Sequence, residues 1–187
     1  MKKVVLLVVI SIFFITGCSV KRTEDVTDGE IFASEYAVNK DNVFKYATIE
    51  EVLSLFKDGT GVILFGNSDQ DECYSVVKMF MDLVSENNIS EVYYYDPTMI
   101  RDDGSKEYDE LLNLLGDNLT ITDDDLELMI PSVYFVRDGE IVGYNDEAVL
   151  MLDIADEVEL DDFLKVLEDK YFKLIKKYVD GESEDVD

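Results

Sequence analysis

The chain contains no histidine, only two cysteines and only two prolines among its 187 residues. Histidine is the side chain that titrates near neutral pH, and its imidazole is a common metal ligand. Its absence therefore excludes histidine-based catalysis and histidine-ligated metal sites, and we expect neither a metal nor another cofactor. Two cysteines, Cys18 and Cys73, allow at most one intramolecular disulfide.

Positive charge is also scarce. Lysine and arginine together number 16 against 43 aspartates and glutamates, which gives a formal net charge of −27 at pH 7. A surface this acidic repels the phosphates of nucleic acids and the head groups of anionic lipids. We therefore expect no nucleic-acid partner and a domain held off the membrane. A cationic partner is one use of such a surface, and solubility is a more general one.

The first 17 residues have the pattern of a secretory signal. Two lysines precede residues 4–15, which are apolar except for one serine. A short basic region before a short apolar stretch is typical of export. The stretch is too short for a membrane span, which needs about 20 apolar residues. The residues that end it resemble the bacterial lipobox: Ile15-Thr16-Gly17-Cys18.

This resemblance implies a bacterial lipoprotein. In such proteins the signal is cleaved just before the cysteine, whose thiol receives a diacylglycerol, and further acylation, for example with palmitate, makes the anchor stable. The expected signal peptide is then 1–17, and lipid on Cys18 would hold the chain to the extracytoplasmic side of a cell membrane or outer membrane. An uncleaved anchor or a cut elsewhere is the alternative. With Cys18 acylated, Cys73 would be the only free thiol.

The rest of the chain divides by composition. Residues 18–42 are polar and lack sustained periodicity, so we expect a tether there, with at most one helical turn at 31–36. The folded domain is predicted at 43–179, and 180–187 is an acidic tail. The segment 122–125 is rich in acids and is typical of a helix start. It lacks the spacing and central glycine of a calcium-binding loop.

Strands and helices alternate within the predicted domain. Short apolar runs predict strands, and apolar residues at helical spacing predict helices. The Asp138-Gly139 pair between two strand-like runs predicts a β-hairpin. The order indicates an α/β fold with a mixed sheet. The strands are expected at 43–47, 61–66 and 92–95, and the helices at 49–58, 71–87, 105–116 and 161–179.

Three segments together resemble the thioredoxin fold. They are a buried run leading into a long helix, a strand led by a proline, and the hairpin that follows it. The resemblance covers 43–179, with an insertion at about 97–128. It implies a three-layer sandwich with a mixed central sheet and flanking helices. The segments read Val62-Ile63-Leu64-Phe65, Ile130-Pro131-Ser132-Val133-Tyr134-Phe135 and Arg137-Asp138-Gly139-Glu140-Ile141-Val142-Gly143.

In this family the proline is cis and shapes a peptide-binding face beside the active site. The resemblance therefore implies a cis bond between Ile130 and Pro131, with a groove beside it. A trans proline that opens an edge strand is the alternative. An extended peptide or another exported protein is the partner expected in the groove, held by strand-like backbone pairing.

The family's redox motif, Cys-x-x-Cys, starts the helix after the buried strand. At that position this chain reads Gln70-Asp71-Glu72-Cys73. The resemblance implies that glutamine replaces the attacking cysteine and that only the resolving position keeps its sulfur. Disulfide exchange needs a thiolate, which neighbouring carboxylates disfavour. We therefore interpret Cys73 as a partly buried, small apolar residue.

The sequence thus predicts a membrane-anchored binding or accessory domain that lacks dithiol oxidoreductase activity. The alternative is an enzyme, a monothiol oxidoreductase or thiol sensor that uses Cys73.

Overall fold

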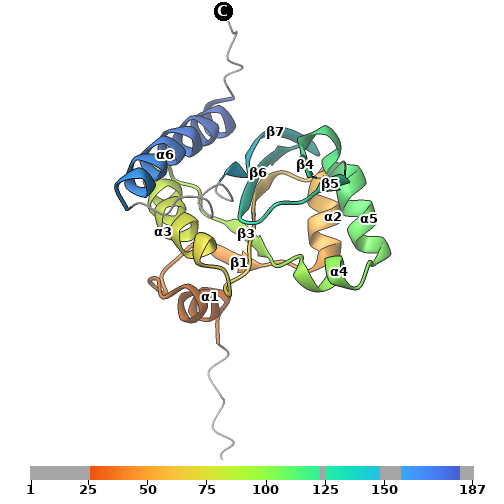
Figure 1. The fold of residues 1–187 in the computed structure, drawn as a ribbon, viewed down its shortest axis with the longest axis horizontal. Coiled ribbons are helices and arrows are strands. Elements are labelled where there is room, and N and C mark those ends of the chain that lie inside the picture. Colours follow the sequence, from red (N-terminus) through yellow and green to blue (C-terminus); the bar gives the residue numbers. More distant parts are fainter. Residues whose placement is uncertain (1–25, 123–124, 148–156, 182–187) are drawn as a thin grey trace, which may run out of the picture.

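A five-stranded mixed sheet forms the centre of the molecule (Figure 1). The structure is a computed structural model that describes residues 26–122, 125–147 and 157–181. The strand order is β1-β3-β2-β6-β7. The first three strands in this order are parallel, whereas β6 and β7 are antiparallel to their neighbours. The strands are β1 (Phe44–Tyr46), β2 (Gly61–Phe65), β3 (Val92–Tyr95), β6 (Ser132–Arg137) and β7 (Glu140–Asn145).

Helices cover both faces of the sheet (Figure 1). One face carries α1 (Asp28–Tyr36), α3 (Asp71–Glu86) and α6 (Glu157–Asp180), and the other carries α2 (Ile49–Asp58) and α5 (Lys106–Leu115). The expected α/β three-layer sandwich with a mixed central sheet is therefore confirmed. The segment predicted as an insertion holds α5 and four short elements: α4 (Thr98–Asp102), η1 (Gly116–Asn118), β4 (Thr120–Thr122) and β5 (Asp125–Glu127).

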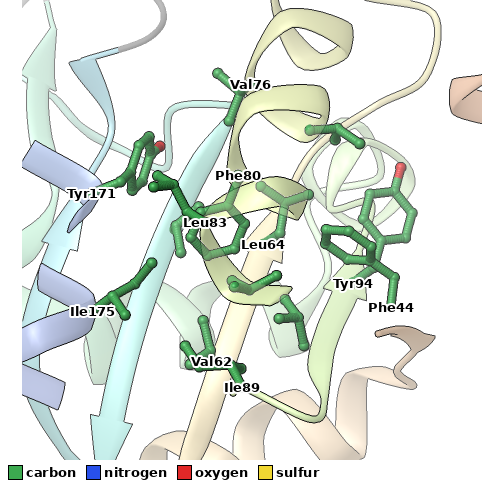
Figure 2. Close-up of a cluster of buried hydrophobic side chains, with 14 of the residues drawn as sticks. Phe44, Val62, Leu64, Val76, Phe80, Leu83, Ile89, Tyr94, Tyr171 and Ile175 are labelled. Atoms are coloured by element: carbon green, nitrogen blue, oxygen red, sulfur yellow. The ribbon is translucent and has the colours of Figure 1, made fainter. Parts of the chain in front are cut away.

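The central strand β2 divides the core in two. Val62 and Leu64 belong to the cluster under α3 and α6, where Figure 2 shows Leu64 beside Phe80. Ile63 and Phe65 belong to the cluster under α2 and α5. Side chains alternate between the two faces of a strand, and each fully buried large apolar side chain contributes about 1.5–3 kcal/mol. The uninterrupted apolar run is thus explained by burial on both faces.

The predicted hairpin between β6 and β7 is confirmed. Asp138 and Gly139 have φ of 51° and 79°, the left-handed conformation that a two-residue hairpin turn requires. A side chain at Gly139 would also come within 2.4 Å of the Lys57 carbonyl oxygen. Glycine is therefore required there for both conformation and space.

The predicted tether is wrong for residues 28–36, because α1 lies there and packs into the core. Thr27 caps this helix: its hydroxyl accepts from the Glu30 N–H, and the Glu30 carboxylate accepts from the Thr27 N–H. Phe32 is fully buried and stacks on Phe44 at 4.0 Å between ring centroids. The folded domain thus begins at α1, not at residue 43. The predicted signal, Cys18 and most of the acidic tail lie outside the described residues.

The helix start expected at 122–125 is also wrong. β4 and β5 form a short antiparallel ladder there, with Thr120 opposite Glu127. Aspartate favours turns as well as helix N-termini. The apolar residues that follow, Leu126, Leu128 and Ile130, recur every second position, which is the period of a strand.

Removing the Phe32 ring should destabilise the whole domain. We expect Phe32→Ala to lower the free energy of unfolding by about 3–5 kcal/mol, as measured by urea denaturation. Ile31→Ala is the matched control, because Ile31 on the same helix is 39% exposed. Equal, small effects of the two substitutions would contradict the assignment of α1 to the core.

Candidate functional site

The loop between β2 and α3 ends in a tight turn. The N–H of Gln70 donates to the carbonyl of Asn67, and the N–H of Cys73 donates to the carbonyl of Gln70, both at 3.1 Å. Gln70 is the N-cap residue of α3, but its side chain makes no capping hydrogen bond. The amide group of Gln70 is therefore free to face the surface and the nearby thiol.

The thiol of Cys73 is fully buried at the start of α3. Its Sγ accepts a hydrogen bond from the N–H of Asn67 at 3.4 Å, and its S–H donates to Gln70 Oε1 at 3.9 Å. Burial raises the pKa of Cys73 to about 11, the carboxylates of Glu72 and Asp96 also raise it, and the Asn67 hydrogen bond lowers it. At neutral pH the sulfur is therefore a protonated, inaccessible thiol.

A small hollow opens where the loop before β6 faces the start of α3. The Ile130–Pro131 peptide bond is cis, as the family resemblance implies. The hollow has a volume of about 250 Å³, and its lining residues are Gln70, Glu72, Arg101, Glu127, Leu128, Met129 and Ile130. The structure thus brings together three of the predicted site residues, Gln70, Glu72 and Ile130. Cys73 and Pro131 are buried and do not line it, and Asp71 is exposed outside it.

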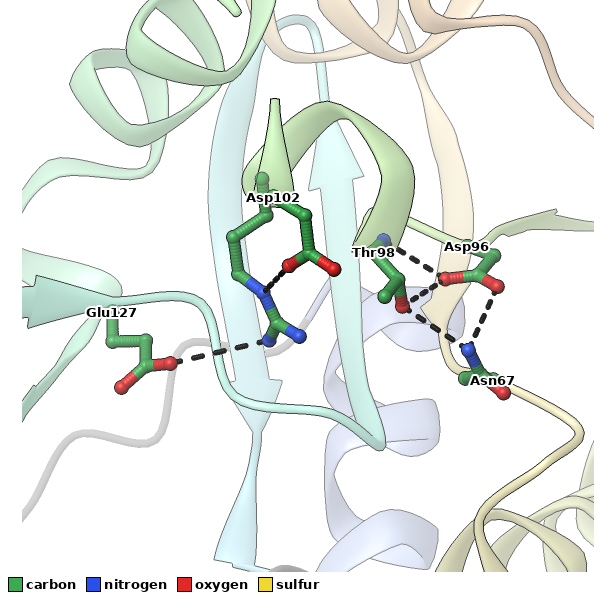
Figure 3. A network of polar contacts seen from close by, with 6 residues as sticks. Asn67, Asp96, Thr98, Asp102 and Glu127 are labelled. Atoms are coloured by element: carbon green, nitrogen blue, oxygen red, sulfur yellow. Dashed lines mark hydrogen bonds and ion pairs between the residues drawn. The ribbon is translucent and has the colours of Figure 1, made fainter. Parts of the chain in front are cut away.

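A polar network holds α4 beside the hollow (Figure 3). Asn67 Nδ2 donates to Asp96 Oδ2 at 3.0 Å and to Thr98 Oγ1 at 3.1 Å. On the same helix, the Arg101 guanidinium lies 3.4 Å from Asp102 Oδ1 and 4.0 Å from Glu127 Oε1. These contacts tie the loop after β2 to α4, and α4 to β5. They position Arg101 in the wall of the hollow.

Two large apolar side chains lie on elements that border the hollow. Met99, on the same helix as Arg101, is 78% exposed, and Leu126, which precedes Glu127 on β5, is 50% exposed. Sequence reasoning missed both, and it also missed Arg101. The segment 97–128 offered no motif that marks these residues. Arg101 becomes a neighbour of Gln70 only when the chain folds.

The hollow is lined by polar, charged and aliphatic side chains. It presents an amide, two carboxylates, a guanidinium and aliphatic side chains, without a reachable thiol. Among the described residues, no cluster of three or more cysteine, aspartate and glutamate side chains is arranged to hold a metal ion. The arrangement can bind a charged side chain, and no thiol or hydroxyl group is among the side chains that line it.

Alkylation should report the buried thiol directly. In a Cys18→Ser chain, which leaves Cys73 as the only thiol, we expect iodoacetamide at pH 8.5 to label the native chain about a hundredfold more slowly than the urea-unfolded chain, whose thiol pKa is about 8.5. Because the folded pKa is the higher one, stability should also fall as pH rises from about 8.5 toward the folded value. Mass spectrometry measures the rate of labelling. If the native chain is labelled as fast as the unfolded chain, Cys73 is not a buried thiol.

The chain matches no family model and no curated protein. Five chains of solved structures match it. One is thioredoxin O2 from Arabidopsis thaliana in the oxidized state, with 18% sequence identity and a TM-score of 0.36 over 68% of this chain and 96% of that chain. The strand order, the helices on both faces and the proline-led strand β6 define the fold by themselves. The chain has a thioredoxin-like α/β fold.

Proposed function

We propose that this chain is a membrane-anchored, extracytoplasmic thioredoxin-like lipoprotein whose domain binds an extended peptide segment and carries out no redox chemistry. The observation that supports this most strongly is the pairing of a buried thiol with an open hollow. The sulfur of Cys73 is inaccessible, whereas Gln70 and Glu72, which line the hollow, are partly exposed and available for contact. We take Gln70–Cys73 to be the degenerate form of the family's redox motif.

The size and charge of the hollow indicate what it binds. Sites for small molecules usually measure about 300–1,000 Å³, so a volume of about 250 Å³ suits one side chain of a longer segment. The carboxylates of Glu72 and Glu127 favour a lysine or arginine of the ligand at this position. Arg101 forms an ion pair with Glu127. Leu128, Met129 and Ile130, which line the hollow, offer apolar contacts for flanking residues. An extended segment with alternating basic and apolar side chains fits this arrangement.

The burial of Cys73 weighs against the enzymatic alternative. A monothiol oxidoreductase or thiol sensor needs an accessible sulfur with a lowered pKa, whereas burial raises the pKa of Cys73. The start of a helix stabilises an anion by only about 0.3–1 kcal/mol at exposed sites, which is too little to offset that burial.

The proposed anchor rests on the lipobox-like residues that end at Cys18. In the described part of the chain, every helix is too short or too polar to cross a bilayer.

Binding at the hollow can be measured with a fluorescent peptide in which lysine alternates with leucine. We expect Glu72→Lys to weaken the affinity about tenfold, because it replaces an attraction with a repulsion in a partly buried site. The measurement is fluorescence anisotropy with the full chain. Asp82→Lys is the matched control. Asp82 lies on the same helix but outside the hollow, and its substitution changes the net charge by the same amount.

The same assay separates the two functions. Binding that survives Cys73→Ser and dithiothreitol supports noncovalent recognition. A complex that forms only with Cys73 intact and dissociates on reduction would establish the thiol enzyme instead. Equal weakening by Glu72→Lys and Asp82→Lys would show that only the net charge attracts the peptide, and the hollow would then be the wrong site.

Lipidation gives a separate test. In a bacterial host we expect the chain to enter the detergent phase of a Triton X-114 separation and Cys18→Ala to move it to the aqueous phase, because one cysteine carries all the acyl chains. Cys73→Ala should leave the partition unchanged. If Cys18→Ala stays in the detergent phase, the anchor is not a lipid on Cys18.

A further inference from the structure

A second hollow, which shares no lining residue with the first, is lined by lysines. It lies between the edge strand β7 and α6 and has a volume of about 340 Å³. Its lining residues are Tyr144, Asn145, Glu147, Lys170, Lys173, Leu174 and Lys177. Three lysines at one hollow form a local reversal of charge in a chain with 43 acidic and 16 basic residues.

The lysines follow the direction of β7. Leu174 packs so closely on Gly143 that a side chain added there would come within 2.6 Å of it, and Lys170 forms an ion pair with Glu147, just beyond the strand. The residue numbers rise along β7 as they fall along α6, so the two elements run antiparallel. A helix rises 1.5 Å per residue, so Lys173 and Lys177 are about 6 Å apart along the axis.

The outer edge of β7 offers backbone groups for pairing. Within the described residues, β7 pairs only with β6, and none of the backbone hydrogen bonds outside helices and strands involves β7. An added strand would place side chains of one face about 6.7 Å apart, every second residue. This repeat is close to the spacing of Lys173 and Lys177.

We propose that the lysine-lined edge of β7 binds an acidic, extended segment of a partner protein by strand addition, with carboxylates on alternate residues facing Lys173 and Lys177. This goes beyond the proposed function, because it concerns a second surface with the opposite charge preference. Exposed ion pairs contribute only about 0–1 kcal/mol. The existing pairs of Lys170 with Glu147 and of Lys173 with Asp169 can therefore be exchanged for a ligand's carboxylates.

Charge selects this occupant over a second copy of the chain. Pairing two β7 edges would bring two sets of lysines together, and lysines at sheet edges discourage such pairing. The position also disfavours a membrane surface, since α1 packs on β1, at the opposite edge of the sheet from β7 (Figure 1). The first helix of the domain is α1, so the β7 edge faces away from the N-terminal side of the domain.

The test uses the full chain and a fluorescent peptide in which glutamate alternates with valine. We expect saturable binding that the double variant Lys173→Glu/Lys177→Glu weakens about tenfold or more. The matched control is Lys165→Glu/Lys176→Glu, which makes the same charge change on α6 outside this hollow and should alter the affinity less than about twofold. A peptide with N-methylated amides keeps its charges but cannot pair its backbone, and it should bind more weakly.

The outcomes are decisive even if a variant folds poorly, since the N-methylated peptide leaves the protein unchanged. No binding to the native chain, equal loss in both double variants, or full affinity of the N-methylated peptide would overturn the proposal. Concentration-dependent dimerisation lost in Lys173→Glu/Lys177→Glu would identify a second copy as the occupant and would also overturn it. Binding of the lysine–leucine peptide should be unchanged in this variant, so the two surfaces can fail independently.

Discussion

The structure depends on the burial of β2 on both faces. A strand whose four residues Val62 to Phe65 are all apolar is stable only if helices cover it from above and below. α3 and α6 cover one side, and α2 and α5 cover the other. α3 begins shortly after the end of β2. The turn at Gln70 and the sulfur of Cys73 therefore lie at the carboxyl end of this central strand. The site is thus a consequence of how the core is covered.

Placement at a helix start does not by itself activate a thiol, and the magnitudes show why. Raising the pKa of Cys73 from about 8.5 to about 11 costs the thiolate about 3 kcal/mol relative to an exposed thiol. The N-terminus of a helix returns about 0.3–1 kcal/mol at an exposed position. The balance favours the protonated form. Cys73, next to Glu72 and under the loop at Asn67, is therefore part of the core. Its neighbours Gln70 and Glu72 provide the polar groups at the surface of the hollow.

Sequence reasoning predicted the parts of this fold that depend on local patterns. The apolar run of β2 and the Asp138-Gly139 turn were recognised because each pattern has one main structural interpretation. α1 was missed although Thr27 and Glu30 form a capping box in the sequence, because the short apolar set of Phe32 and Tyr36 was outweighed by polar neighbours. Only the tertiary contact with Phe44 makes that segment part of the core.

The candidate site divides in the same way. The sequence allowed Gln70, Glu72 and Ile130 to be placed together, because the start of a helix and the start of a proline-led strand meet at the same end of the sheet. Arg101 could not be placed with them, because its position depends on the long-range hydrogen bonds from Asn67 to Asp96 and Thr98, at the start of α4. No local rule connects residues so far apart in the chain, and the segment between them has no pattern of its own.

Net charge and local charge act at different ranges in this molecule. Screening at physiological ionic strength limits exposed charges to about 8 Å, so a ligand in contact with Lys173 and Lys177 senses those two residues more than the distant acids. The same holds at Glu72, where the acidic surroundings reinforce the local charge. An acidic chain can therefore carry one surface that agrees with its net charge and another that opposes it. If both proposed surfaces bind as inferred, selection of a partner depends on noncovalent contacts, and the opposite charges of the surfaces would allow one small domain to distinguish two kinds of extended segment.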